Sequence, residues 1–221
     1  MTLCLVTDRR RLGEALGLPE GDWVKTLHRQ IEAAAAAGID YIQVREPDIE
    51  AGPLVELVKS LMRVVTGSSR ILVNDRLDVA LAARAHGVHL KEHSLLPAEV
   101  SRLSPPGFVI GCSVHDISSI AARKSADFLI AGTVLPTASK RAVDYLDQDG
   151  LSKVVEAAAG QPVLGIGGMD LSAMPMLAST GASGLAAIGA FIPAAGEDLP
   201  DFVQNRVSAL RKAFDLARRR T

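Results

Sequence analysis

Eight short apolar runs alternate along the chain with segments of helical periodicity. The runs begin near Leu3, Tyr41, Arg70, Gly87, Val109, Phe128, Val163 and Gly184. In the first long helical segment, residues 23–37, apolar side chains recur at Val24, Leu27 and Ile31. Alternation of strand and helix predicts a parallel sheet with right-handed crossovers. Eight such units predict a closed (β/α)8 TIM barrel that spans residues 1–221 as a single domain.

The same periodicity predicts helices over residues 52–65, 77–85, 97–103, 117–124, 151–159 and 199–219. An open, doubly wound sheet is the alternative architecture. It would prefer a glycine-rich phosphate turn after the first strand, where this chain has the polar sequence Thr7-Asp-Arg-Arg. Residues 132–149 are the longest irregular stretch, and we predict that they form a lid loop.

Composition and charge narrow the class of protein. The formal net charge is −1 and aromatic residues make up 4% of the chain, which disfavours nucleic acid and anionic membranes as partners. The first apolar run is too short for a signal peptide and is followed by the charged Asp8. Cys4 and Cys112 lack metal-ligand spacing and indicate buried free thiols. We expect a cytoplasmic protein with no nucleic-acid or membrane partner.

Two glycine-containing turns follow the last two predicted strands. Gly167 and Gly168 follow the seventh strand, and Ile188 and Gly189 follow the eighth. Glycine lets the backbone approach an anion and present its N–H groups to it. In TIM barrels the loops after strands 7 and 8 commonly bind phosphate. The pair of turns therefore predicts a phosphate site, although one such turn alone could be only a helix entry.

Polar side chains gather where the other strands end. They are Gln43, Arg45, Asn74, Asp75, His89, Ser113 and His115. The carboxyl ends of the strands open into one mouth, where barrel enzymes hold their catalytic residues. Simpler interpretations exist for several of them: Asn74 and Asp75 could cap a helix, and His89 could be a packed, hydrogen-bonded side chain. His115 lies just past a strand, on a loop, and is favoured as a functional residue.

An ordered set of motifs resembles the thiamine-phosphate synthase and TenI family over almost the whole chain. The motifs are Leu5-Val-Thr-Asp8, Ile42-Gln-Val-Arg-Glu46, Val73-Asn-Asp-Arg76, Gly87-Val-His-Leu90, Gly111-Cys-Ser-Val-His115, Gly132-Thr-Val-Leu-Pro-Thr-Ala-Ser-Lys140 and Leu164-Gly-Ile-Gly-Gly-Met169. The resemblance implies a TIM barrel. The synthases join a pyrimidine pyrophosphate to a thiazole phosphate with Mg²⁺, whereas the characterised TenI branch is a thiazole tautomerase.

The resemblance also assigns roles to individual residues. The positions that match pyrimidine-pyrophosphate contacts are Gln43, Arg45, Asn74, Ser113 and Lys140, and Asp75 matches one Mg²⁺ ligand. The positions that fall on the thiazole-phosphate pocket are Thr137, Ser139, Gly168, Ile188 and Gly189.

Three departures from the synthase pattern bear on the reaction. Pro47 stands where the synthases have a lysine, and Ser94 stands where they have the aspartate that completes the metal site. The serine usual near Gly189 is also absent. Mg²⁺ prefers oxygen ligands in octahedral geometry, and a serine hydroxyl replaces a carboxylate poorly. Whether Glu46 or Glu92 substitutes for the lost ligand stays open at this point.

A tautomerase needs only a phosphate anchor and a proton shuttle, so our leading hypothesis is a thiazole phosphate tautomerase without a cofactor. His115, which matches an active-site histidine of the TenI branch, would move the proton. Arg45 would pair with the substrate carboxylate, and Lys140 completes the catalytic set. The alternative is a thiamine-phosphate synthase that uses Mg²⁺ through Asp75. A third hypothesis is a non-catalytic sensor of a phosphorylated metabolite, and a homo-oligomer is compatible with all three.

Overall fold

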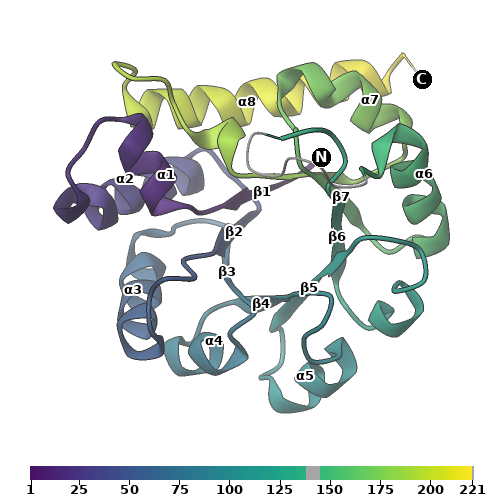
Figure 1. The fold of residues 1–221 in the computed structure, drawn as a ribbon, viewed down its shortest axis with the longest axis horizontal. Helices are drawn as coiled ribbons and strands as arrows, with labels where there is room; N and C mark the ends of the chain where they lie inside the picture. The colour runs from purple at the N-terminus through teal and green to yellow at the C-terminus, as the bar shows by residue number, and fades with distance from the viewer. Residues whose placement is uncertain (138–144, 221) are drawn as a thin grey trace.

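The fold is seen in a computed structural model, which describes residues 1–137 and 145–220. Eight parallel strands form a barrel that is closed by pairing of the first strand with the last (Figure 1). They are β1 (Thr2–Val6), β2 (Tyr41–Val44), β3 (Arg70–Asn74), β4 (Gly87–Leu90), β5 (Val109–Val114), β6 (Phe128–Gly132), β7 (Val163–Ile166) and β8 (Gly184–Ala187). The predicted TIM barrel is confirmed, and the doubly wound sheet is excluded.

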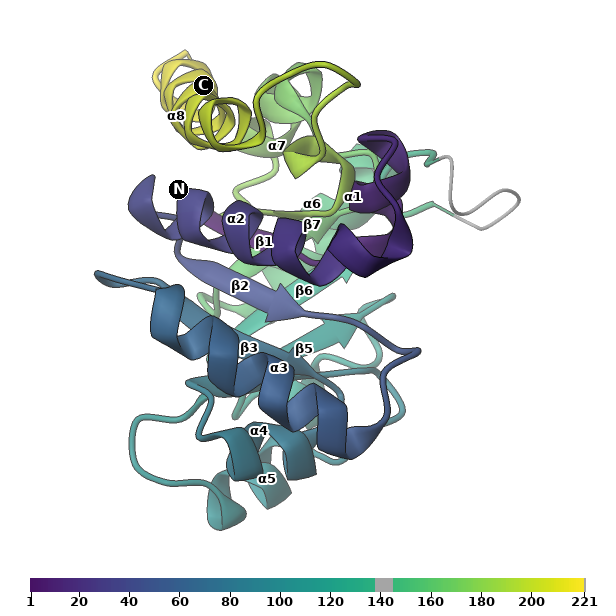
Figure 2. The same ribbon diagram turned by 90° about the vertical axis from the view of Figure 1, so that its left-hand side faces the viewer.

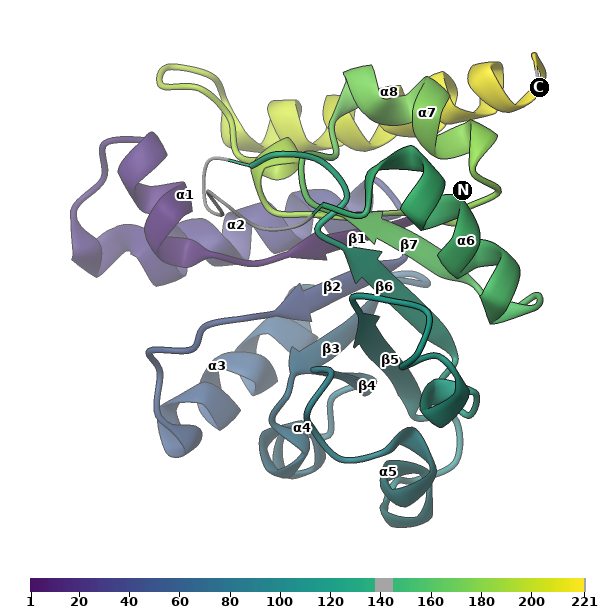
Figure 3. The same ribbon diagram turned by 45° about the vertical axis from the view of Figure 1, so that its right-hand side comes forward.

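The helices surround this barrel. They are α1 (Arg9–Ala15), α2 (Trp23–Ala36), α3 (Ala51–Val64), α4 (Leu77–Ala83), α5 (Pro97–Leu103), α6 (Asp147–Ala158), α7 (Met174–Ser179) and α8 (Leu199–Arg218). Figure 2 shows α2 and α3 beside the strands β1 to β3. The long α8 lies alongside α2 and α7 (Figure 3). Within the described residues, no helix is both long and apolar enough to cross a membrane.

One predicted helix was wrong, and one helix was not predicted. The segment 117–124 contains only a short 3-10 turn, Ala121–Arg123. The carboxylate of Asp116 accepts hydrogen bonds from the backbone N–H groups of Ser118 and Ser119, which gives the chain a local turn in place of a helix. Conversely, α1 was not predicted. Its sequence is mostly polar, but Asp8 caps it by accepting from the N–H of Arg11.

The barrel interior is filled by side chains from alternate strand positions. Val6, Leu72, Ile130 and Leu164 belong to a compact apolar cluster with Phe128, whose ring stacks on Tyr41 with the centroids 4.7 Å apart. A second and larger cluster lies between the strands and the helices. The filled interior leaves the strand ends as the place where polar side chains can meet a ligand.

Candidate active site

The glycine turn after β7 is shaped by its close contact with the segment that follows β6. Gly167 and Gly168 have φ angles of 96° and 65°. A Cβ atom on Gly167 would lie 2.4 Å from Cγ2 of Thr133, and one on Gly168 would lie 2.6 Å from Cβ of Leu135. Any larger residue would therefore clash and strain the backbone. The turn is accessible to solvent at Gly168, which is exposed.

The turn after β8 lies next to a cation that the sequence interpretation missed. A Cβ atom on Gly189 would lie 3.1 Å from Nη2 of Arg11, which belongs to α1. Among the residues that the structure describes, no hydrogen bond or ion pair engages the Arg11 guanidinium. Because α1 was not predicted from the sequence, the contact between Arg11 and Gly189 was not expected. Arg11 supplies positive charge at the turn where the serine usual in the synthases is absent.

Three polar side chains meet at the ends of β2, β3 and β4. Nε2 of Gln43 donates to Oδ1 of Asn74 at 2.8 Å and lies 3.2 Å from Nδ1 of His89. Because Gln43 donates, Nδ1 of His89 accepts, and the imidazole carries its hydrogen on Nε2. Burial lowers the pKa of His89 to about 4, so the ring is neutral at physiological pH. His89 is packed and hydrogen-bonded, as the simpler interpretation of the sequence predicted.

Two atoms of this cluster have no partner. Oε1 of Gln43 and Nε2 of His89 are buried and make no hydrogen bond within the described residues. A buried polar atom without a partner costs about 1–3 kcal/mol, so such atoms usually bind water or a ligand. Oε1 of Gln43 is an acceptor, and Nε2 of His89 is a donor. The pair suits a neutral heteroaromatic group that offers both an N–H and a ring nitrogen.

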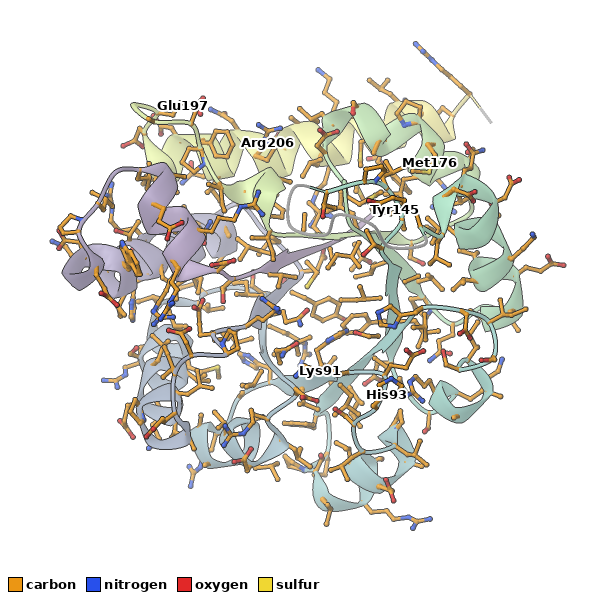
Figure 4. The ribbon with its side chains drawn as sticks, in the orientation of Figure 1. Lys91, His93, Tyr145, Met176, Glu197 and Arg206 are labelled. Carbon is orange, nitrogen blue, oxygen red and sulfur yellow. The ribbon has the colours of Figure 1, made fainter. Side chains whose placement is uncertain are left out.

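Asp75, the candidate metal ligand, is engaged on both oxygens. Oδ2 lies 2.7 Å from Nζ of Lys91, and Oδ1 accepts the hydroxyl of Ser94. Burial raises the pKa of Asp75, but the hydrogen bonds from Lys91 and Ser94 outweigh it and leave the pKa below its ordinary value. Lys91 is 61% exposed, so it can also face a ligand. Figure 4 shows it at the rim of the barrel.

Glu46 is held in a structural network. Its carboxylate accepts from the Thr7 hydroxyl at 2.7 Å and from Nη1 of Arg9 at 2.9 Å. Arg9 also pairs with Asp48 at 2.8 Å. Burial raises the pKa of Glu46 despite these bonds, whereas the Arg9 guanidinium holds the pKa of the more open Asp48 well below its ordinary value. The network joins the loop after β1 to the loop after β2, and Glu46 does not replace the lost metal ligand.

His115 forms a pair with Glu92. Nδ1 of His115 lies 2.8 Å from Oε2 of Glu92, and the histidine is half exposed. The buried Arg123 donates to the backbone oxygen of Glu92 and so fixes the loop that carries it. A carboxylate that orients one ring nitrogen leaves the other free for proton exchange. Glu92 is thus a partner of His115 and not of Asp75.

The structure gives fewer contacts for the other predicted site residues. Arg45 is exposed, and its backbone N–H donates to the Thr7 hydroxyl at 2.9 Å. Ser113 and Thr137 are half-buried. Ser139 and Lys140 lie outside the described residues, as does part of the predicted lid, residues 132–149. Within that range α6 already begins at Asp147.

A separate cavity lies away from the strand ends. It has a volume of about 460 Å³ and borders the first half of α8, where Glu197 and Arg206 are among its lining residues (Figure 4). None of the predicted site residues lines it. A smaller cavity of about 140 Å³ is lined by Asn74, Asp75 and Lys91 among others. We place the active site at the mouth beside the smaller cavity, because the charged side chains of Asp75 and Lys91 line it and Asn74, which also lines it, accepts from Gln43.

Comparison with known proteins identifies the family. The family described as "Thiamine monophosphate synthase" matches residues 15–191. The chain belongs to this family. It is 34% identical to the thiamine-phosphate synthase of Pyrococcus abyssi over 97% of this chain and 95% of that protein. It is 31% identical to the thiamine-phosphate synthase of Desulfitobacterium hafniense over 92% of this chain and 98% of that one.

A solved structure supports the same relationship. The thiamine phosphate pyrophosphorylase from Pyrococcus furiosus superposes with a TM-score of 0.75 at 30% identity, covering 98% of this chain and 96% of that one. The protein is therefore an enzyme of thiamine biosynthesis with a TIM-barrel fold. The names of its relatives agree better with the synthase alternative than with our leading hypothesis of a tautomerase.

Proposed function

We propose that this enzyme forms thiamine phosphate from a pyrimidine pyrophosphate and a thiazole phosphate. The observation that carries the proposal is the buried, unpartnered pair formed by Oε1 of Gln43 and Nε2 of His89. An aminopyrimidine would satisfy both atoms, since its amino group donates and its ring nitrogens accept. A tautomerase that takes only a thiazole has no need of hydrogen-bonding groups for a second heteroaromatic ring. The synthase names of the relatives point the same way.

In this reaction the thiazole nitrogen forms a bond to the methylene carbon of the pyrimidine. The bond between that carbon and the pyrophosphate oxygen breaks, and pyrophosphate leaves with the bonding electrons. Gln43 and His89 would orient the pyrimidine ring. Arg45 and Lys91 would bring positive charge to the pyrophosphate. The turns at Gly168 and Gly189, with Arg11, would hold the thiazole phosphate.

The carboxylates at the mouth do not fit a Mg²⁺ ion. Both oxygens of Asp75 are engaged by Lys91 and Ser94, and Glu46 is occupied by Thr7 and Arg9. In the described part of the chain, no three acidic, histidine or cysteine side chains gather as a metal site. We therefore assign the chemistry of the site to the protein's own cations and hydrogen-bonding groups.

The tautomerase is the second candidate, favoured by the pair of His115 and Glu92. An exposed histidine oriented by a carboxylate at a strand end is the arrangement that proton transfer requires. A synthase has no proton to move in the bond-forming step described above. If the enzyme is a tautomerase, His115→Asn should lower its turnover by roughly 10²–10⁴-fold, the usual contribution of a positioned acid or base.

One assay with two substrate sets separates the candidates. Purified enzyme is incubated with pyrimidine pyrophosphate plus thiazole phosphate, and separately with the thiazole carboxylate phosphate tautomer. We expect thiamine phosphate and pyrophosphate in the first set. Gln43→Met should lower kcat/KM by about tenfold, the effect of one lost hydrogen bond, while His115→Asn keeps most of the activity. Conversion only in the second set would establish the tautomerase, and phosphate-ligand binding without turnover in either set would establish a sensor.

A further inference from the structure

The misfit between the mouth and a divalent metal has a specific cause in this chain. We infer that the ammonium group of Lys91, held by Asp75, is a resident cation that takes the place of the metal ion, while the Ser94 hydroxyl occupies the other oxygen of Asp75. The inference concerns the same mouth as the proposed function but holds for either candidate activity, because it describes the charge of the site and not the bond that is formed.

The local fold brings the three side chains together. Asp75 directly follows β3 and Lys91 directly follows β4, and these two strands pair with Asn74 opposite His89. The backbone N–H of Asp75 donates to the oxygen of His89 at 2.8 Å, which fixes the two strand ends against each other. The chain then turns, with the N–H of Ser94 donating to the oxygen of Lys91 at 3.2 Å. One short turn therefore delivers both partners of Asp75.

The distances exclude a metal at Asp75. Mg²⁺ binds oxygen at about 2.0–2.1 Å and requires near-octahedral geometry. Nζ of Lys91 lies 2.7 Å from Oδ2 of Asp75, so an ion on that oxygen would meet a positive charge at close range. The other oxygen is occupied by the Ser94 hydroxyl. A metal could enter only if the ammonium left.

The charges balance without a metal. A site of two carboxylates neutralises one divalent ion. In this chain the second carboxylate is replaced by Ser94, which is neutral, and the remaining Asp75 is neutralised by the single charge of Lys91. The neutral Ser94 and the positively charged Lys91 together leave the site without an excess of negative charge. Of the neighbouring acids, Glu46 pairs with the Arg9 guanidinium, and Glu92 makes its hydrogen bond to His115.

The position of Lys91 also lets it act on a substrate. Its side chain is 61% exposed and lines the cavity of about 140 Å³ together with Asn74 and Asp75. An ammonium group has three donors, and Asp75 uses one of them. The remaining donors can bind an oxygen of a phosphate, a pyrophosphate or a carboxylate.

Mn²⁺ serves as the probe, because the free ion has an electron paramagnetic resonance signal that is lost on binding. The unliganded protein is titrated with Mn²⁺ in the absence of substrate. We expect no saturable binding to the natural chain and saturable binding of one ion to the double variant Lys91→Ala/Ser94→Asp. The matched control is Ser208→Asp/Lys212→Ala on α8, which makes the same change of charge at exposed positions and should not bind.

The result that overturns the inference is saturable Mn²⁺ binding by the natural chain that Asp75→Asn abolishes. A folded double variant that gains no binding also overturns it, because Lys91 would then not be what excludes the metal. Circular dichroism establishes that the variants are folded. If the double variant does not fold, the titration of the natural chain alone decides. Substrate is absent throughout, so a failure of the proposed synthase activity would leave this result unchanged.

Discussion

His89 gives the protein a pH dependence of stability whose size follows from its burial. The side chain is buried and neutral, with its pKa lowered to about 4 from an ordinary value of 6.5, chiefly because burial disfavours the charged ring. In the unfolded chain the imidazole takes up a proton near its ordinary value. Between these two pKa values the unfolded state therefore binds more protons than the folded state. Stability must fall as the pH falls through this window.

The magnitude can be worked from the two values. One unit of pKa difference corresponds to 1.36 kcal/mol, so the roughly 2.5 units here give at most about 3 kcal/mol. The loss should begin near pH 6.5, be nearly complete near pH 4, and level off below that. Above pH 7 the contribution of His89 is fully present, because the ring is neutral in both states.

The assay is urea unfolding at a series of pH values between 4 and 8, for the natural chain and for His89→Gln. The glutamine cannot titrate, but its side-chain oxygen can still accept the hydrogen bond from Gln43. Other groups, including the partly buried His86, whose pKa is also lowered by burial, contribute equally to both proteins. The difference between the two curves isolates His89.

Two results would refute this reasoning. One is a difference between the two curves that stays flat with pH. The other is a nuclear magnetic resonance titration in which the His89 ring protonates near 6.5 in the folded protein. Either would mean that the ring is less buried, or better paired when charged, than the hydrogen bonds of the Gln43 cluster indicate.

Two further predictions concern arginines of α1. Arg11→Ala should weaken binding of inorganic phosphate by about tenfold, the effect of losing one charge-assisted hydrogen bond. The control Arg10→Ala should not weaken it, because Arg10 pairs with Asp48. Calorimetry measures both affinities, and equal values for the two variants would show that Arg11 is not part of the site. Arg9→Ala should lower the free energy of unfolding by about 3–5 kcal/mol, because it leaves the buried Glu46 carboxylate without its cation. Urea unfolding measures this, and a loss below about 1 kcal/mol would show that the network around Glu46 is not structural.

Much of the fold could be predicted because periodicity reports burial. The strand starts at Tyr41, Arg70 and Val109 were predicted correctly, since strands of a parallel barrel are apolar on both faces. The predicted helix over residues 97–103 also agrees with α5. The failures lie where local hydrogen bonds decide the structure. Asp116 replaces a helix by a turn, and Asp8 caps a polar helix that has almost no apolar face.

In the candidate site, too, some residues could be predicted from the sequence and others could not. Residues at strand ends, such as Gln43, Asn74 and His89, could be placed at one mouth from sequence because the register of parallel strands brings them there. The partners beyond the strand ends could not. That Lys91 reaches back to Asp75 depends on the path of the loop after β4, and that Arg11 lies over Gly189 depends on the position of α1, neither of which was predicted from periodicity.

This division bears on how far a family resemblance can be carried over. Asp75 keeps its place because the end of β3 fixes its backbone, but its chemistry is set by Lys91 and Ser94 on the neighbouring loop. The family resemblance assigns this carboxylate to a metal, whereas in this structure it neutralises a lysine. Glu46 shows the same effect, since this acid at the mouth is paired with Arg9 at the start of α1. Strand ends therefore determine which residues face the substrate, and the loops determine which charges they present to it.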